Sequence, residues 1–330
     1  MIGTRLRPLL DHLASERPEA AEAWRGWRIE RIAGGHNGLV YRATDEAADL
    51  AVKFTPRDAR DRAGREYHAL NVLQHLGLDL APEPILLERD RYEHPVVVQS
   101  WLEGTVSPCP PRDEAEWTQL ARHYAAIHAV TPTAGAGALP RAVITGTRAQ
   151  HALERLAREV ARIPSGAQPA ELRALVAQAE GMPWPAWPQP AFVLCRVDPN
   201  PLNFIRRPGR WASVDWENSG WGDPAFEIAD LLACPAYAAV SRTRWEGFVA
   251  ACFEQCADAT ATIRVGTYYV LTLAWWAALS ARLRYEIAHG LEERRLVERP
   301  AGWREQMPRQ YEQCLARAQQ ALVAFAERPR

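Results

Sequence analysis

The first hundred residues carry two hydrophobic periods. Leucines from residue 6 to residue 13 recur at helical spacing, which predicts an amphipathic helix over residues 3–24. Beyond it, apolar and polar residues alternate as in strands, with one helical stretch inserted. The predicted strands span residues 27–32, 39–43, 49–54, 82–87 and 95–99, and the inserted helix spans residues 58–76. This order predicts a small antiparallel sheet with one helix inserted between its strands.

After residue 104 the pattern becomes mostly helical, beginning with one apolar face along residues 113–130. Further helices are predicted at residues 146–162, 169–180, 224–233, 241–257, 261–288 and 303–326, and short strands at residues 191–197, 203–206 and 211–215. The length of 330 residues also favours about two domains or lobes. We therefore predict an α+β fold, with an N-terminal sheet lobe at residues 1–100 and a larger, mainly helical lobe at residues 101–330.

The composition is that of an ordinary folded protein and argues against nucleic-acid and membrane partners. Hydrophobic residues make up 48% and charged residues 24%, values at which extensive disorder is not expected. The formal net charge of −1 lacks the basic footprint of a nucleic-acid-binding protein. The N-terminus has no apolar secretory segment, and the longest apolar stretch, residues 268–279, is too short to cross a membrane. We expect a cytoplasmic protein with six reduced, mostly buried cysteines, a monomer or homodimer without nucleic-acid or membrane partners.

The cationic residues are unusual in type, because Lys53 is the only lysine beside 38 arginines. Either this lysine is an accident of composition, or it occupies a site that arginine cannot serve. It lies in a predicted strand after the glycine turn 34–38, the position at which kinases grip the α- and β-phosphates of the nucleotide. A compact ammonium and a guanidinium fork differ in shape, so arginine is a poor substitute there. We favour the phosphate-gripping role and expect the side chain to lie in an open cleft.

Two neighbouring features fit a nucleotide site less specifically. The turn Gly34-Gly35-His36-Asn37-Gly38 would offer backbone amides to phosphate oxygens, although Asn-Gly is also the commonest hairpin dipeptide. Glu66, thirteen residues after Lys53, would pair with the lysine and orient it. The segment around Glu66 is rich in charges, so a surface glutamate is the alternative interpretation.

The most specific pattern lies between residues 192 and 217. An apolar strand leads into Asp198, Asn203 follows five residues later, and Asp215 ends a third strand twelve residues after that. Phosphoryl transfer needs a base near the acceptor hydroxyl and oxygen ligands for magnesium, and these residue types suit both tasks. A loop of turn-forming Asp and Asn residues is the alternative. The flanking strands and the upstream features favour the catalytic interpretation.

The chain resembles the aminoglycoside phosphotransferase and choline kinase-like family, small-molecule kinases with the architecture of protein kinases. The resemblance rests on the glycine turn and the strand after it, on the Asp198–Asn203 loop, and on the segment from Asp215 to Asp230. It covers residues 27–235 and continues more weakly to the end of the chain. It implies a two-lobed protein kinase-like fold that uses ATP and Mg²⁺.

The resemblance also implies roles for individual residues. Asp198 would be the catalytic base, and the metal ligands would be Asn203, Asp215 and, as an extra ligand, Glu217. The nucleotide-binding residues would be Gly34, Gly35, Asn37, Gly38, Val40, Lys53, Glu66, Gln99, Trp101 and Leu102, the last three belonging to a hinge at residues 99–102. Asp223 and Asp230 are interpreted as structural carboxylates that brace the catalytic segment.

The predicted function is ATP-dependent transfer of the γ-phosphoryl group to a hydroxyl of a small polar molecule, such as an aminoglycoside, amino sugar or amino alcohol. The chain departs from the family's usual His-Gly-Asp, because its catalytic loop reads Arg196-Val197-Asp198. Valine in place of glycine restricts the backbone. A catalytically weak or inactive nucleotide-binding protein on the same fold is therefore the alternative. A protein kinase is disfavoured, because no Ala-Pro-Glu signature follows Asp215.

The identity of the acceptor stays open in the sequence. The C-terminal third offers several glutamates, with arginines between them: Glu286, Glu292, Glu293, Glu298 and Glu305. We therefore expect a solvated charged face there and no trap for a polycationic acceptor. Several tryptophans lie in the C-terminal helices, where the family builds its acceptor pocket, and we expect at least half of them to pack in the core.

Overall fold

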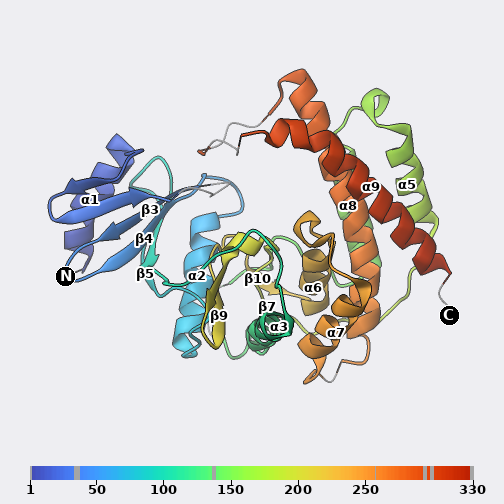
Figure 1. The fold of residues 1–330 in the computed structure, drawn as a ribbon, viewed down its shortest axis with the longest axis horizontal. Coiled ribbons are helices and arrows are strands. Elements are labelled where there is room, and N and C mark those ends of the chain that lie inside the picture. Colours follow the sequence, from blue (N-terminus) through green and yellow to red (C-terminus); the bar gives the residue numbers. More distant parts are fainter. Residues whose placement is uncertain are drawn as a thin grey trace.

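The structure is a computed structural model that describes residues 2–32, 38–135, 139–256, 258–292, 296–297 and 301–327. A six-stranded antiparallel sheet lies at one end of the molecule, and a mainly helical part forms the rest (Figure 1). We call the part from the first helix to the last strand of this sheet the N-terminal lobe, and the part that follows it the C-terminal lobe. The predicted α+β, two-lobed architecture is confirmed.

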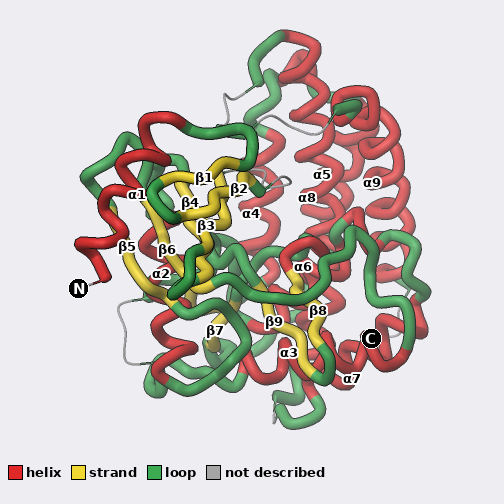
Figure 2. The backbone as a smooth tube through the Cα atoms, turned by 60° about the vertical axis from the view of Figure 1, so that its left-hand side comes forward, coloured by secondary structure: helices red, strands yellow, loops and turns green. Residues whose placement is uncertain are grey.

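The N-terminal lobe consists of the sheet and two helices, of which α2 lies between the sheet and the C-terminal lobe (Figures 1 and 2). The strands are β1 (Glu22–Trp24), β2 (Trp27–Arg31), β3 (Leu39–Thr44), β4 (Asp49–Phe54), β5 (Pro84–Glu88) and β6 (Val96–Ser100). The helices are α1 (Ile2–Glu16) and α2 (Arg62–His75). The strands pair antiparallel in the order β1-β2-β3-β4-β6-β5, as expected for a small antiparallel sheet with an inserted helix.

Strand alternation divides this sheet into two faces. Alternate residues of β3 and β4, such as Tyr41 and Val52, are buried in one apolar cluster with the leucines of α1. On β4, Lys53 stands in register with Val40 of β3 and Val97 of β6. Directly opposed residues share a face, and neighbours along a strand point to opposite faces, so these three side chains point away from α1. The alternation thus directs Lys53 toward α2.

Two helix boundaries in this lobe differ from the prediction. The first helix ends at Glu16 and not at residue 24, because Pro18 has no N–H to donate and Arg17 takes a left-handed conformation with a φ of 48°. The following residues 22–24 form the edge strand β1 instead. The second helix begins four residues later than predicted, where the side chain of Asp61 caps its first turn.

The C-terminal lobe contains the predicted helices and strands at nearly the predicted positions. Its α-helices are α3 (Glu114–His128), α4 (Ala149–Val160), α5 (Ala170–Gly181), α6 (Pro224–Ala233), α7 (Arg242–Phe253), α8 (Ala261–His289) and α9 (Trp303–Ala326). Short 3₁₀ turns lie at η1 (Ser165–Ala167), η2 (Pro201–Asn203) and η3 (Pro235–Tyr237). Two antiparallel strand pairs complete the lobe: β7 (Val193–Cys195) with β10 (Gly220–Gly222), and β8 (Phe204–Arg207) with β9 (Arg210–Ser213). The prediction lacks β10, because Gly-Trp-Gly shows no alternating pattern.

Helix α8 is the centre of the C-terminal lobe and contacts α4, α6 and α9 (Figure 1). Trp245 of α7 packs edge-on against Trp117 of α3 inside the main apolar cluster, with ring centroids 5.2 Å apart. All six cysteines are free in this structure, and four of them are buried, as expected for most of them. Among the helices of the described ranges, none has the length and apolar character needed to cross a membrane.

A buried histidine joins α3 to the hairpin of β8 and β9. His123 donates from Nδ1 to the carbonyl oxygen of Trp211 (3.2 Å), and its Nε2 accepts from the hydroxyl of Ser213 (3.0 Å). Burial, reinforced by the nearby Arg196 guanidinium, lowers the pKa of His123 to about 3. The ring therefore stays neutral in the folded protein near pH 6.5, where a histidine of the unfolded chain begins to bind a proton.

We predict that His123 makes the fold sensitive to acid. The unfolded chain binds a proton at this ring below about pH 6.5 and the folded chain does not, so acid favours unfolding. Between about pH 7.5 and about pH 5.5 this residue should remove about 1.4 kcal/mol from the free energy of unfolding. Urea unfolding at both pH values should show this extra loss in the wild type and not in His123→Gln. An equal pH dependence in the two proteins would contradict the assignment.

Candidate active site

The side chain of Lys53 joins three elements that lie far apart in the sequence. Its Nζ donates to Oε2 of Glu66 on α2 at 2.7 Å, and to the carboxylate of Asp215, which follows β9. Oε2 of Glu217 lies 3.4 Å from the same nitrogen. Strand alternation brings the lysine to this point from β4, and helix α2 brings Glu66. The ammonium of Lys53 thus joins the N-terminal lobe to residues 215–217 of the C-terminal lobe, which lie between β9 and β10.

Lys53 is enclosed, which corrects the expectation of an open cleft. The residue is 6% exposed and Glu66 is 0% exposed. Burial alone would lower the pKa of Lys53, but the carboxylates of Asp215, Glu66 and Glu217 outweigh it and raise this pKa well above its usual value. Asp215 shows the reverse balance: burial acts to raise its pKa, and the ammonium of Lys53 brings the pKa below its usual value. The lysine is therefore charged, and the ionised carboxylate of Asp215 matches its charge.

A second cation, Arg62, completes this group and was missed by the sequence analysis. Its Nη1 donates to Oε1 of Glu217, and its Nε donates to Oδ2 of Asp58 at 2.8 Å. Arg62 is 6% exposed and lies one turn before Glu66 on α2, so both side chains face the same side of the helix. That spacing was the available signal, although many other charges in the segment obscured it. Glu217 is held between Arg62 and Lys53, and its role as a metal ligand stays a prediction.

The loop after β7 positions Asp198. Its Oδ1 accepts from the backbone N–H of Asn200 at 2.9 Å, and its Oδ2 accepts from Nδ2 of Asn203 at 2.8 Å. Because the side-chain nitrogen of Asn203 donates to Asp198, the side-chain oxygen of Asn203 is the atom that would bind a cation. Burial raises the pKa of Asp198 to about 7, with the Arg196 guanidinium acting against that rise. The predicted five-residue spacing therefore brings both side chains into direct contact.

Arg196 organises this loop from inside. It is fully buried, and its guanidinium donates to the backbone carbonyl oxygens of Asp198 and Val214, the latter at 3.3 Å. The guanidinium carbon also lies 4.6 Å from the ring centroid of Phe204. These contacts tie the loop of Asp198 to the residue that precedes Asp215. The arginine thus organises the loop around Asp198 from within.

The backbone of the site is strained at two points. Val197 has a φ of 55° and Asp215 a φ of 63°, both in the left-handed region. A β-branched residue is rare there, and such strain persists only where surrounding contacts hold it. Glycine at the first of these positions would adopt this conformation freely. The loop conformation therefore depends on contacts from outside the loop.

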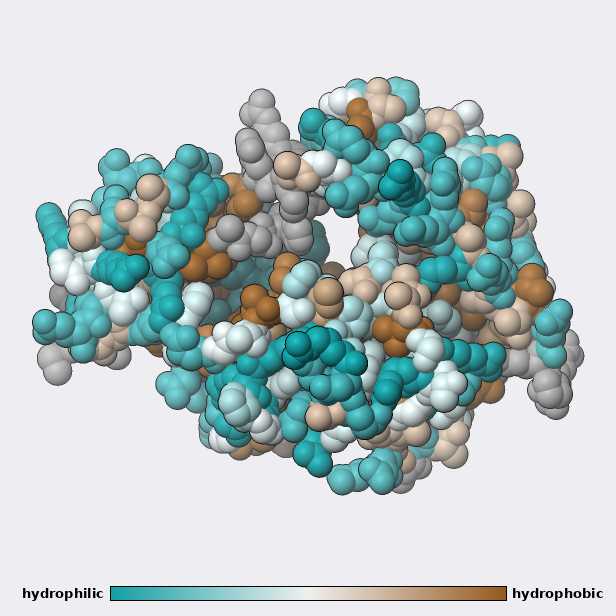
Figure 3. Space-filling view, in the orientation of Figure 1, coloured by the Kyte–Doolittle hydropathy of each residue, from teal (hydrophilic) through white to brown (hydrophobic). Residues whose placement is uncertain are grey.

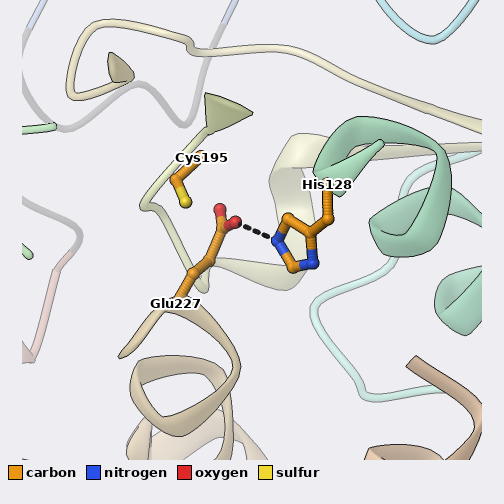
Figure 4. A group of neighbouring side chains, drawn as sticks. All are labelled: His128, Cys195 and Glu227. Carbon is orange, nitrogen blue, oxygen red and sulfur yellow. Dashed lines mark hydrogen bonds and ion pairs between the residues drawn. The ribbon is translucent and has the colours of Figure 1, made fainter. Parts of the chain in front are cut away.

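Those contacts come mainly from Glu227 on α6, which the sequence analysis did not single out. Its Oε1 accepts from the backbone N–H groups of Arg196 (2.8 Å) and Val197 (2.7 Å). Its Oε2 accepts from Nε2 of His128 at 2.7 Å, as Figure 4 shows. Burial acts to raise the pKa of Glu227, but the hydrogen bond from His128 brings it below its usual value. An ionised carboxylate thus holds the strained peptide units in place.

Cys195 lies beside this pair, and its Sγ, His128 and Glu227 offer ligand atoms within 4.8 Å of one another (Figure 4). Burial raises the pKa of the Cys195 thiol well above its usual value, and a metal ligand would have to be a thiolate. Both oxygens of Glu227 already accept hydrogen bonds. Glu227 and His128 therefore restrain the loop of Asp198, and the group does not offer the free ligand atoms that a metal centre needs.

The predicted nucleotide loop is only partly within the described residues. Gly34, Gly35 and Asn37 lie outside them. Gly38 packs so closely on β4 that a Cβ there would stand 2.5 Å from the carbonyl oxygen of Phe54, which explains the need for glycine. Val40 stands in register with Lys53 on the same face of the sheet.

The predicted hinge begins inside the sheet. Gln99 is 5% exposed on β6, in register with Ala51 of β4, and the backbone N–H of Trp101 donates to the carbonyl oxygen of Asp49 at 2.9 Å. The Trp101 ring lies 4.6 Å from the guanidinium carbon of Arg42. Leu102 follows outside regular structure. An adenine at this hinge would therefore have to use backbone groups other than the N–H of Trp101.

The donor set fits a divalent cation. Four carboxylates, on Glu66, Asp198, Asp215 and Glu217, stand beside three cationic side chains, on Lys53, Arg62 and Arg196. Oε1 of Glu66 is buried and has no hydrogen-bond partner within the described part of the chain. Burial raises the pKa of Glu66 to about 7, which means that ionising this carboxyl inside the protein costs free energy. An added cation bound by oxygen ligands would relieve that excess.

Comparison with known proteins gives a family and a fold. Residues 28–256 match the phosphotransferase enzyme family. A comparison with curated proteins gave no match. A solved choline/ethanolamine kinase family protein from Mesorhizobium loti is similar with a TM-score of 0.63 at 18% identity, over 100% of this chain and 96% of that one.

Two solved phosphotransferases share the same fold. A spectinomycin phosphotransferase in complex with ADP and spectinomycin has a TM-score of 0.62 at 12% identity, over 96% of this chain and 98% of that one. A macrolide 2′-phosphotransferase from Brachybacterium faecium has a TM-score of 0.57 at 20% identity, over 98% of this chain and 99% of that one. The similarity extends over nearly the whole length of each protein.

We predict that Lys53 is as important for stability as for chemistry. Lys53→Met would leave buried carboxylates without their cation, which should cost about 3–5 kcal/mol of unfolding free energy. In Lys53→Met/Glu66→Gln one of those carboxylates is also neutralised, so this double variant should lose less than the sum of the two single variants. Urea unfolding measures all three. Arg60→Met, at an exposed ion pair, is the control and should cost at most about 1 kcal/mol. Strict additivity would contradict the buried pairing.

Proposed function

The chain belongs to the phosphotransferase enzyme family, and from this membership we propose that it transfers the γ-phosphoryl group of ATP to a hydroxyl of a small polar molecule. The observation that supports this most is the connected group of Lys53, Asp215, Asn203 and Asp198. Lys53 contacts Asp215, and Asp198 contacts Asn203. Arg196 links the two pairs through the backbone of Asp198 and Val214. Phosphoryl transfer needs these same tasks to be held in one place: a base, cation ligands and a phosphate-binding ammonium.

In this proposal Asp198 acts on the acceptor. Its carboxylate accepts the proton of the acceptor hydroxyl while that oxygen bonds to the γ-phosphorus, and the bond to the β-phosphate oxygen breaks to release ADP. The hydrogen bonds from Asn200 and Asn203 fix the orientation of the carboxylate. A rigid base lowers the barrier mainly by positioning, since it arrives aligned with the hydroxyl.

The nucleotide would be held by Lys53 and by backbone groups of the glycine-rich residues 34–38. A divalent cation, when bound by Asn203 and Asp215, neutralises phosphate charge and orients the γ-phosphoryl group. Glu66 keeps the ammonium of Lys53 in place, and Glu217 and Arg62 brace it from the other side. We further propose that residues 1–100 bind the nucleotide, that residues 101–330 supply the catalytic loop and the acceptor site, and that residues 99–102 face the adenine.

A weakly active or inactive nucleotide-binding protein is the second candidate, and the strained Val197 favours it. Two observations oppose it. Arg196 makes its hydrogen bonds inside the loop and leaves the carboxylate of Asp198 facing Asn203. Glu227 holds the amide of Val197 at 2.7 Å, so the strained conformation is well supported. The departure from the usual His-Gly therefore leaves the hydrogen bonds of Asp198 with Asn200 and Asn203 intact, which supports the active alternative.

We predict that Asp198→Asn separates binding from chemistry. The asparagine keeps the size and an acceptor for the Asn203 amide but cannot take a proton, so turnover should fall by at least about a hundredfold. ATP affinity, measured by calorimetry, should stay within about twofold, because the base acts on the acceptor. Asp90→Asn, at an exposed loop, is the matched control. Turnover near the wild-type level would remove Asp198 from this role.

We predict that Asp215→Asn weakens ATP binding chiefly through the metal. One anionic ligand is lost, so affinity for ATP should fall by about tenfold or more in the presence of Mg²⁺. Affinity in the presence of a chelator should change much less. Calorimetric titrations under both conditions give the ratio directly. The same loss with and without Mg²⁺ would instead assign Asp215 to the pairing with Lys53 alone.

A further inference from the structure

A cavity of about 550 Å³ lies in the N-terminal lobe, on the face of the sheet that α1 covers. Its walls come from α1, from the ends of β3 and β4, and from the turn between β5 and β6. Leu39 of β3 and Phe54 of β4 stand in register and are buried in one apolar cluster with the leucines of α1. Lys53, the neighbour of Phe54, points to the opposite face and contacts Glu66 there. The cavity is therefore separate from the candidate active site, and its volume is in the range of small-molecule sites.

Two polar contacts join α1 to the turn between β5 and β6 and frame the cavity. At one end, Oδ1 of Asp11 accepts from Nη2 of Arg91 at 3.1 Å and from the hydroxyl of Tyr92 at 2.9 Å. At the other end, Nη2 of Arg17 donates to Oε2 of Glu93 at 2.7 Å. Asp11 and Arg17 are six residues apart, which is about 9 Å along a helix. The frame thus has about the length of two fused aromatic rings.

The inner wall of the cavity is apolar. Leu13, Leu39 and Phe54 line it and are each at most 5% exposed. The ring of Phe54 lies edge-on to the ring of Tyr92, with centroids 6.3 Å apart, so two aromatic side chains meet in this wall. On the side of the molecule that Figure 3 shows, the surface of the N-terminal lobe is by contrast mainly hydrophilic. An apolar, partly aromatic wall suits an aromatic ligand.

One polar group of the wall has a buried atom without a partner. Nδ1 of His94 is buried and has no hydrogen-bond partner in the described part of the chain. The other ring nitrogen, Nε2, lies 3.6 Å from Oε1 of Glu93, and a carboxylate beside Nε2 favours the tautomer that carries its proton there. Burial lowers the pKa of His94, which keeps the ring neutral at pH 7. Nδ1 is therefore a buried acceptor, and leaving it unpaired is costly.

The charges around the cavity balance. Asp11 is paired with Arg91, and Glu93 is paired with Arg17. Neither sign is in excess among these four side chains, so they do not favour an anion or a cation over a neutral molecule. A charged ligand would also lose hydration against the apolar wall. An uncharged ligand avoids that cost.

We propose that this cavity is a binding site for an uncharged aromatic molecule of two fused rings that carries one hydroxyl or N–H donor, of the naphthol or indole class. The rings lie against the apolar wall of Leu39 and Phe54, and the donor bonds to Nδ1 of His94. This site goes beyond the proposed function and does not depend on it, because the residues that would hold the nucleotide lie on the other face of the sheet.

Calorimetric titration of the full chain with three naphthalenes tests the ligand class. 2-Naphthol has the rings and the donor, 2-methoxynaphthalene has the rings without a donor, and 2-naphthalenesulfonate is an anion. We expect one equivalent of 2-naphthol to bind with a Kd of about 100 µM or tighter, which is within reach of a ligand of this size. The other two should bind at least about tenfold more weakly. No saturable binding of 2-naphthol, or equal affinity for either of the other compounds, would overturn the proposal.

Two variants test where the compound binds. His94→Phe keeps a ring but removes the acceptor, so the preference for 2-naphthol over 2-methoxynaphthalene should disappear. Ala14→Trp fills the cavity from α1 and should weaken 2-naphthol binding by at least about tenfold. His75→Phe, at the exposed end of α2, is the matched control and should change neither quantity. A preference that persists in His94→Phe would overturn the assignment, and this readout decides alone if Ala14→Trp does not fold.

Competition with nucleotide separates this cavity from the candidate active site. The affinity for 2-naphthol should stay within about twofold when ADP and Mg²⁺ are added at saturating concentration, because uncoupled sites leave each other's affinity unchanged. Displacement of 2-naphthol by ADP would place the compound in the nucleotide site and overturn the proposal.

Discussion

The ammonium of Lys53 is the interaction on which the site depends. It is enclosed by the carboxylates of Glu66, Asp215 and Glu217, which come from α2 and from the segment after β9. A buried charge is tolerated only when it is paired, so these elements must lie where they do for the lysine to be accommodated. Arg62 forms a second buried ion pair, in which its guanidinium balances the carboxylate of Glu217. The lobes are thus held in register by charge as well as by packing, and the surplus of carboxylates is the property that suits a divalent cation.

The loop of Asp198 depends on a different constraint, because its own sequence does not favour its shape. Val197 holds a left-handed conformation that costs of order 1–3 kcal/mol and is imposed from outside. Glu227 supplies the restraint through two backbone amides, and His128 fixes the carboxylate. Arg196 then links the loop to the strand end that leads to Asp215. The position of Asp198 is therefore a property of the whole helical lobe, reached through α3 and α6.

Local pattern was enough to predict the architecture and the order of the site residues. Strand alternation gave the face on which Lys53 lies, and the spacing between Asp198 and Asn203 brought their side chains together. What escaped prediction depends on partners distant in sequence: the pairing of Arg62 with Glu217, the restraint by Glu227, and strand β10, which exists only because β7 lies beside it. The burial of Lys53 escaped for the same reason, since Asp215 lies 162 residues away. The predicted end of the first helix was wrong for a local reason, since Pro18 in the sequence already indicated an earlier end.

The central claim is phosphoryl transfer to a small molecule, and ³¹P NMR of ATP and Mg²⁺ with a protein-free metabolite extract tests it directly. The account predicts a new phosphomonoester resonance that grows in step with ADP and is absent when the protein is omitted. Formation of ADP and inorganic phosphate alone, or no loss of ATP, would contradict it.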